Sequence, residues 1–155
     1  MASELTHFRS FLAVYMGGGS LDHHAIFIEN SGNKTRPTGS LFHVIGSLQN
    51  GMSFNMRHSN TPTSSFSFQS MKQIGWISHN TFDEVEGVVR SILPPIKQYD
   101  GARRLVPKDQ IRHCQHWAAE VSNTLQEKGV LTLLAPGDNG LVYTRDTNGE
   151  VIWNL

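Results

Sequence analysis

The stretch Arg112-His113-Cys114-Gln115-His116-Trp117 holds the single cysteine of the chain and belongs to the longer of its two helical patterns. Apolar residues recur at steps of three and four from about Asp109 to Lys128, and Gly129 follows as a stop signal. Cys114 shares the apolar face of this pattern with Ile111, Ala118, Val121 and Leu125. The sequence therefore predicts a helix over 109–128 that carries the cysteine on its buried side.

The start of this helix has two interpretations. If the helix already begins near Pro107, Cys114 lies up to two turns inside it, where the helix dipole has little effect on a thiol. If Pro107 to Gln110 form a separate turn, Cys114 lies closer to the helix N-terminus, where a thiolate is stabilised. We favour the second interpretation.

The sequence before this helix has the pattern of strands. Asn50-Gly51 predicts a hairpin, Gly17-Gly18-Gly19 predicts a turn, and residues 59–65 form a polar linker. The predicted strands cover 9–16, 23–29, 41–45, 52–57 and one or two segments within 66–78. This order, with strands mainly first and helices later, indicates an α+β fold.

A shorter helix is predicted over 82–93. Thr81-Phe82-Asp83-Glu84 matches a capping box at its start, and Pro94-Pro95 ends it. The tail is expected to form a hairpin around Asn148-Gly149. We therefore expect an antiparallel sheet packed against two main helices, in a single domain that spans residues 1–155.

Composition narrows the class of protein. Of the 155 residues 38% are apolar and 17% charged, and the net charge is zero with neutral histidines, so no basic surplus favours nucleic acid as a partner. The apolar runs fall far short of the roughly 20 residues of a membrane helix, and no signal peptide is evident. One cysteine excludes a disulfide within the chain. We expect a cytoplasmic protein without a stable membrane anchor.

A thiol becomes a good nucleophile as a thiolate, and a neighbouring imidazole can take its proton. Two histidines lie on predicted strands, His23 at the start of the second and His43 in the middle of the third. If these strands pair, one histidine can act as base while the other orients it. Cys114, His23 and His43 are therefore the candidate catalytic residues.

Three further residues are candidates for substrate binding. His24 follows His23, and strand alternation places the two on opposite faces; we favour His23 as the base and leave His24 as the alternative. Tyr15 precedes the glycine turn and can line the site, although a core position is its simpler interpretation. Trp117 is expected to pack beneath the cysteine helix. His116 is interpreted as structural.

The segments around these residues carry a family resemblance. His23-His24-Ala25-Ile26-Phe27-Ile28 resembles the first histidine motif of the lecithin:retinol acyltransferase-like proteins, which belong to the circularly permuted branch of the papain-like, NlpC-type superfamily. Leu41-Phe42-His43-Val44-Ile45-Gly46 is similar to their second histidine strand, and Cys114-Gln115-His116-Trp117 to their cysteine motif. The order His, His, Cys is the permuted order, which is shared with the permuted desumoylating isopeptidases.

The resemblance implies a permuted papain-like fold and a thioester acyl-enzyme. Cys114 would be the nucleophile, His23 the general base and His43 the orienting residue of a hydrolase or acyl transferase. The substrate would be a small-molecule or peptide-like amide, ester or thioester, with no cofactor. The sequence departs from the family pattern at His113, where a short polar residue that can cap the helix is usual.

Two other classes of function remain open at this point. The first is a non-catalytic binding or scaffold protein on the same fold, in which Cys114 is a packed core residue. The second is a metal-binding protein in which His113 and His116 act with Cys114 or His23. No acidic residue or second cysteine accompanies these ligands, so we expect no metal site.

Overall fold

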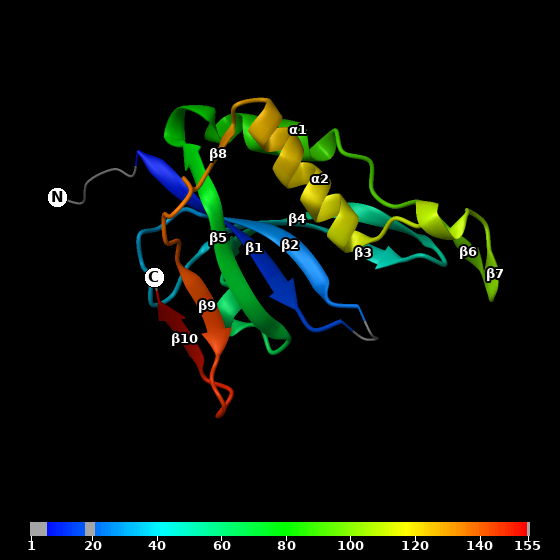
Figure 1. Cartoon of the computed structure of the whole chain (residues 1–155), viewed down its shortest axis with the longest axis horizontal. Coiled ribbons are helices and arrows are strands. Elements are labelled where there is room, and N and C mark those ends of the chain that lie inside the picture. Colours follow the sequence, from blue (N-terminus) through cyan, green and yellow to red (C-terminus); the bar gives the residue numbers. More distant parts are fainter. Residues whose placement is uncertain (1–5, 18–20, 155) are drawn as a thin grey trace.

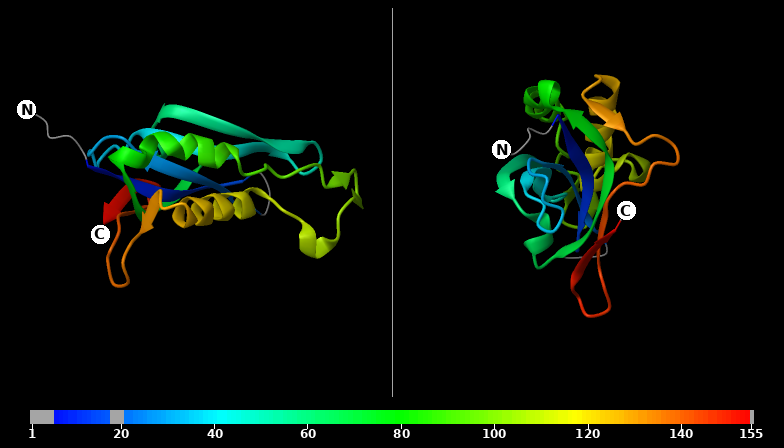
Figure 2. Two further views of the ribbon diagram at one scale, coloured as in Figure 1. Left: turned by 90° about the horizontal axis from the view of Figure 1, so that it is seen from above. Right: turned by 90° about the vertical axis from the view of Figure 1, so that its left-hand side faces the viewer.

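The computed structural model describes residues 6–17 and 21–154, which form an α+β fold around one large antiparallel sheet (Figure 1). The strands of this sheet run in the order β10-β9-β5-β1-β2-β3-β4, and β8 pairs with β5. They are β1 (His7–Tyr15), β2 (His23–Glu29), β3 (Gly39–Ser47), β4 (Gly51–Asn60), β5 (Phe68–Ser78), β8 (Leu131–Leu133), β9 (Val142–Arg145) and β10 (Val151–Asn154). A small hairpin of β6 (Tyr99–Asp100) and β7 (Arg103–Arg104) projects beyond one end of the sheet (Figure 2).

The helices pack on one face of this sheet. They are α1 (Val85–Arg90) and α2 (Cys114–Glu127), with short 3-10 turns at η1 (Pro62–Ser64), η2 (His79–Glu84) and η3 (Lys108–Gln110). Strand alternation divides the core into two clusters. The helix-side cluster joins α1 and α2 to residues such as Ile26 and Phe42. The opposite-side cluster contains Ala25, Phe27 and Leu41.

The predicted strands largely agree with the observed ones in position, but β6, β7 and β8 were not predicted. The second run, His23–Glu29, is β2 without change, and the segment 66–78 holds one long strand, Phe68–Ser78, rather than two. The expected linker at 59–65 begins later, because β4 continues to Asn60 and pairs there with Gly39. The hairpin at the tail is confirmed by β9 and β10. The predicted glycine turn falls at Gly18 and Gly19 outside the described residues.

The predicted helix over 82–93 is wrong at both ends. Ser78, not Thr81, is the N-cap, because its hydroxyl accepts a hydrogen bond from the backbone N–H of Asn80. The Thr81 hydroxyl donates to the carbonyl oxygen of Ser78 instead of capping a helix. Residues His79–Glu84 therefore form the 3-10 turn η2, and the α-helix α1 covers only Val85–Arg90.

The predicted helix over 109–128 begins later than its periodicity suggests. Lys108–Gln110 form the separate turn η3, Ile111 and His113 are extended, and α2 starts at Cys114. The buried Gln98 side chain holds this extended segment: its Oε1 accepts from the N–H of Arg112 (2.7 Å), and its Nε2 donates to the Arg112 carbonyl (2.6 Å). The separate-turn interpretation is confirmed. At the other end Gly129, with φ of 73°, follows the helix as predicted.

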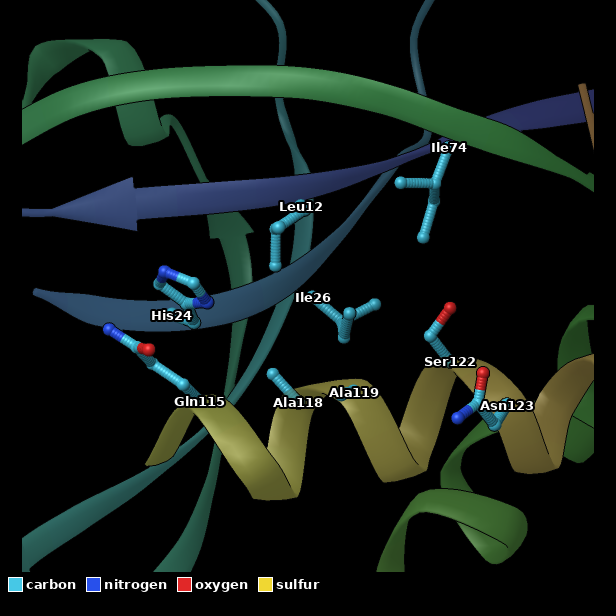
Figure 3. A pocket seen from close by; sticks show the side chains of 9 residues that line it. All are labelled: Leu12, His24, Ile26, Ile74, Gln115, Ala118, Ala119, Ser122 and Asn123. Atoms are coloured by element: carbon cyan, nitrogen blue, oxygen red, sulfur yellow. The ribbon is translucent and has the colours of Figure 1, made fainter. Parts of the chain in front are cut away.

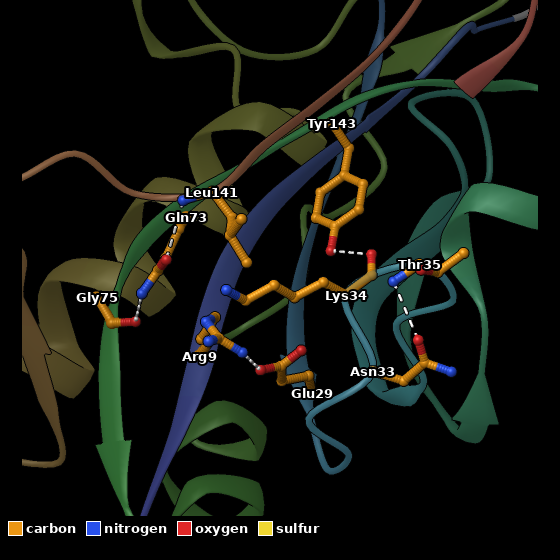
Figure 4. A network of polar contacts seen from close by, with 9 residues as sticks. All are labelled: Arg9, Glu29, Asn33, Lys34, Thr35, Gln73, Gly75, Leu141 and Tyr143. Atoms are coloured by element: carbon orange, nitrogen blue, oxygen red, sulfur yellow. Dashed lines mark hydrogen bonds and ion pairs between the residues drawn. The ribbon is translucent and has the colours of Figure 1, made fainter. Parts of the chain in front are cut away.

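A buried ion pair fixes the end of the sheet at which β2 finishes. Arg9 of β1 donates to the carboxylate of Glu29, which is 1% exposed (Figure 4). Burial raises the pKa of Glu29, and the hydrogen bond from Arg9 opposes this rise. Next to this pair, the Tyr143 hydroxyl of β9 donates to the carbonyl of Lys34 (2.7 Å). These contacts attach the β2–β3 loop to β1 and β9.

The pairing of β8 with β5 depends on the absence of a side chain at Gly75. A Cβ atom there would collide with the carbonyl oxygen of Thr132 in the neighbouring strand. We expect Gly75→Ala to lower the free energy of unfolding by about 1–3 kcal/mol, measured by urea denaturation. Gly87 of α1 is the matched control, because nothing lies within 4 Å of the position that a Cβ atom would take there. Gly87→Ala should raise stability by about 0.5–1 kcal/mol. Equal effects of the two substitutions would contradict this account of β8.

Candidate active site

Cys114 is the first residue of α2, and its side chain is buried at the junction of this helix with β2. Its exposed fraction is 6%, and it belongs to the helix-side core cluster. Its Sγ lies 3.7 Å from the carbonyl oxygen of Asp22, the residue before His23. The side chain of Gln115 donates to the same oxygen (3.0 Å). Two consecutive residues of the helix therefore attach its N-terminus to the start of β2.

His113 caps this helix, at the position where the resemblance predicts a short polar residue. Its ring Nδ1 accepts a hydrogen bond from the N–H of Gln115 (3.3 Å). In return, the Nδ1 of His116 accepts from the N–H of His113 (3.0 Å). Each ring thus accepts a hydrogen bond from a backbone N–H at the start of the helix, which is the arrangement of a capping box. The departure at His113 does not leave the cysteine helix uncapped, and His116 has the structural position that was expected.

His23 and His43 are in direct contact, as the sequence predicted for paired strands. The Nε2 of His23 lies 2.9 Å from the Nδ1 of His43, and the Nε2 of His43 lies 3.0 Å from the Oδ1 of Asn55. An amide oxygen only accepts, so His43 carries its hydrogen on Nε2 and its Nδ1 is an acceptor. His23 must then donate from Nε2. The chain of hydrogen bonds leaves the Nδ1 of His23 unprotonated and able to accept a proton.

Both histidines are neutral near pH 7. Burial, followed by the neighbouring His43 and His24, lowers the pKa of His23 to about 4. Burial also lowers the pKa of His43, while the hydrogen bond to Asn55 opposes the change. A general base must be unprotonated before it acts, and this pair meets that requirement.

The thiol and the histidine pair lie on opposite sides of β2, at a place where the sheet is open. Alternation groups His23 with the opposite-side cluster, whereas Cys114 belongs to the helix-side cluster. However, the β2–β3 ladder runs only from Ile26 to Glu29, so His23 pairs with β1 alone. The His23–His43 contact spans the unpaired part from one side, and Cys114 reaches the backbone at Asp22 from the other.

His24 lies on the helix side, beside the first turn of α2. Figure 3 shows its ring next to the side chain of Gln115, over a shallow pocket of about 190 Å³ that Ala118 and Ile26 also line. Burial lowers the pKa of His24. His24 thus shares a face with Cys114, whereas His23 has the hydrogen-bonded partner.

The other two candidate residues have different positions. Tyr15 lines a cavity of about 280 Å³ on the opposite side together with His23 and His43, and its ring centroid lies 6.1 Å from that of His23. Trp117 is fully buried and its indole N–H donates to the carbonyl of Ile92 (3.2 Å). Trp117 therefore presents no surface to a ligand, since it fills the space between α2 and the end of α1.

Sequence reasoning missed Asn55 and Gln98. Asn55 lies opposite His43, but the Asn50-Gly51 signal does not give this register. A two-residue turn there would place His43 opposite His58, whereas the observed ladder begins with Ser47 paired to Gly51. Gln98 had no signal either, because it lies in an irregular segment, 14 residues from its partner Arg112.

Within residues 6–17 and 21–154, no group of three or more His, Cys, Asp or Glu side chains is arranged to hold a metal ion. In the same ranges, no helix combines the length and apolarity needed to cross a membrane.

The fold and the site define an α+β protein with a cysteine at a helix N-terminus and a buried histidine pair. The sequence model of DUF6540, a family of unknown function, matches residues 10–132. The chain therefore belongs to this family. The matched region includes Cys114, His23 and His43. No curated protein and no solved structure matches the chain.

The helix cap gives a prediction about stability. We expect His113→Ala to lower the free energy of unfolding by about 0.5–2 kcal/mol, because the backbone N–H of Gln115 loses the ring nitrogen that accepts its hydrogen bond. His113→Asn should retain most of the stability, since a carboxamide oxygen can accept the same hydrogen bond. Urea denaturation at neutral pH measures both variants. If Asn is as destabilising as Ala, the cap is not the role of His113.

The histidine pair gives a prediction about pH. The folded-state pKa of His23, about 4, lies below its ordinary value of 6.5. The fold therefore favours the neutral ring, and this contribution to stability is complete above pH 6.5 and is lost as the pH falls through about 4. His23→Asn should flatten this part of the profile of urea midpoint against pH. His7→Asn, at an exposed position, is the control and should leave the profile unchanged. A parallel profile for His23→Asn would contradict the assignment.

Proposed function

We propose that this protein is a permuted papain-like cysteine hydrolase or acyl transferase, with Cys114 as nucleophile and His23 as general base. The hydrogen-bonded chain His23–His43–Asn55 carries the proposal, because it leaves the Nδ1 of His23 as a free base. The position of Cys114 at the first residue of α2 supports it, since a helix N-terminus favours a thiolate.

The opening between β2 and β3 is the route by which the two groups would meet. Cys114 lies against the backbone of Asp22, one residue before His23. His23 has no β3 partner there, so its Nδ1 would meet the thiol through this opening while its Nε2 keeps the hydrogen bond to His43. Formation of the thiolate would in turn raise the pKa of His23, because an opposite charge stabilises the imidazolium.

The chemistry proposed is acyl transfer through a thioester. Cys114 attacks the carbonyl carbon of an amide, ester or thioester, and His23 takes the thiol proton. His23 then gives this proton to the leaving group, and the thioester passes to water or to an amine. The backbone N–H of Cys114 would be the donor to the oxyanion, because the N–H groups of Gln115 and Trp117 already donate to His113. His43 and Asn55 would act through His23, by fixing its tautomer.

Alkylation of Cys114 tests this proposal directly. At about pH 5.5 iodoacetamide should label native Cys114 about tenfold faster or more than it labels a free peptide of residues 109–120. His23→Asn should remove this advantage, and Asn55→Ala should reduce it by less, because the tautomer of His43 is then no longer fixed. The rates are measured by mass spectrometry of the intact protein.

Two controls make the result decisive. His24→Asn should retain the fast labelling if His23 is the base; loss of the advantage in His24→Asn alone would transfer the role to His24, which shares the helix side with Cys114. If native Cys114 reacts more slowly than the peptide, and normally once the protein is unfolded, the thiol is a packed core residue. That outcome would favour a non-catalytic binding protein on this fold.

A further inference from the structure

The cavity of about 280 Å³ on the opposite side of the sheet contains polar and charged side chains that have no role in the proposed reaction. It opens beside the histidine pair, between the ends of β1 and β4 and the segment before β5. Met16 and Leu41 give it apolar walls, and the hydroxyls of Tyr15, Ser65 and Ser67 give it polar ones. Its volume of about 280 Å³ is at the small end for ligand pockets.

Arg57 is the charged side chain of this cavity. It lies on β4 two residues beyond Asn55, so that both face the opposite side of the sheet. No carboxylate lines the cavity among the described residues, and within these residues Arg57 has no ion pair. His23 and His43 are neutral there, so Arg57 gives the cavity a net positive charge. A guanidinium binds a carboxylate through two parallel hydrogen bonds.

Asn60 supplies a second indication of a ligand. Its side chain lines the same cavity, and its Oδ1 atom is buried without a hydrogen-bond partner in the described part of the chain. This oxygen has almost no exposed surface, so it would meet a donor on a bound molecule only after a rotation of the amide, and the new hydrogen bond would offset the cost of leaving it unpartnered. The cavity thus combines one cation with one unused acceptor, beside apolar walls.

We propose that this cavity binds an amino-acid unit with a free carboxylate, as found in N-acyl amino acids and at the C-terminus of a peptide. Arg57 would bind the carboxylate, Asn60 would accept from the amide N–H, and Met16 and Leu41 would contact the side chain. A molecule with the amide and the carboxylate on one carbon supplies both groups within the length of this small cavity.

The binding site stands by itself, but its role in the reaction rests on the proposed function of Cys114 and His23. The bound amino acid would be the leaving group of the amide bond. The Cys114 sulfur forms a bond with the acyl carbon as the C–N bond breaks, and His23 returns its proton to the departing amine. Water then cleaves the thioester and releases the acyl group as a carboxylic acid. The substrate class is therefore an N-acyl amino acid or a peptide cleaved at its last residue.

Binding to the Cys114→Ala protein tests the cavity without any turnover. The probes are N-acetylalanine and N-acetylalaninamide, which have almost the same size and differ in the carboxylate. Calorimetric titration should show that N-acetylalanine binds about tenfold tighter or more. Amide chemical shifts should change at residues 57, 60, 65 and 67 rather than on α2.

Three variants in the same background identify the groups responsible. Arg57→Gln should abolish the preference for the carboxylate, and Arg57→Lys should retain part of it. Asn60→Asp should weaken binding of N-acetylalanine about tenfold or more through charge repulsion, even if Arg57→Gln proves unstable. Arg103→Gln removes the same charge from the exposed β6–β7 hairpin and should have no effect.

The outcomes separate the two proposals. Equal affinity for the two probes, or a preference that survives Arg57→Gln, would overturn the carboxylate site whatever the thiol does. Preferential binding together with slow labelling of Cys114 would retain the site and remove the catalytic function. Fast labelling without preferential binding would leave the nucleophile in place and require another class of substrate.

Discussion

The unpaired start of β2 is the constraint on which the arrangement of the site depends. The β2–β3 ladder begins at Ile26, so the first three residues of β2 are hydrogen-bonded to β1 alone. Along this stretch the His23 and His43 rings lie in contact on one side of the sheet, where no backbone hydrogen bonds join β2 to β3. The same opening leaves the carbonyl of Asp22 free to accept from the side chains of Cys114 and Gln115. Both the histidine pair and the N-terminus of the cysteine helix therefore lie beside the part of β2 that does not pair with β3.

Strand positions could be predicted well because local pattern decides them. The continuous apolar run of β2 and the Asn50-Gly51 hairpin signal indicated where these strands lie. Helix starts were harder, since periodicity continues through residues that the tertiary structure holds extended. Ile111 fits the apolar face of the helical pattern, yet Gln98 holds the neighbouring Arg112 in an extended segment. This contact joins residues that no local rule connects.

The same distinction between local pattern and tertiary packing applies to the candidate site. The contact of His23 with His43 was predictable from strand pairing, and the position of Cys114 near a helix start from the separate-turn interpretation. Which face each histidine occupies relative to the thiol was not predictable, because it depends on how α2 lies across the sheet and on where the ladder opens. The capping by His113 and His116 also escaped prediction, since imidazole is an uncommon cap and acts here only as a reciprocal pair. The permuted papain-like identity stays a prediction.

The segment between α1 and α2 has a consequence for motion. From residue 91 to residue 113 it contains only the short β6–β7 hairpin and η3. Its residues 95–101 are hydrogen-bonded to residues 48–52, and Gln98 is also bonded to Arg112. Local opening of such a segment costs less free energy than opening of the sheet, because few apolar contacts hold it. Since Arg112 and His113 directly precede the thiol, release of this segment would uncap α2 and expose Cys114 while β2 and β3 stay folded. Opening of this segment, rather than unfolding of the sheet, is the motion that would give a reagent access to the buried thiol.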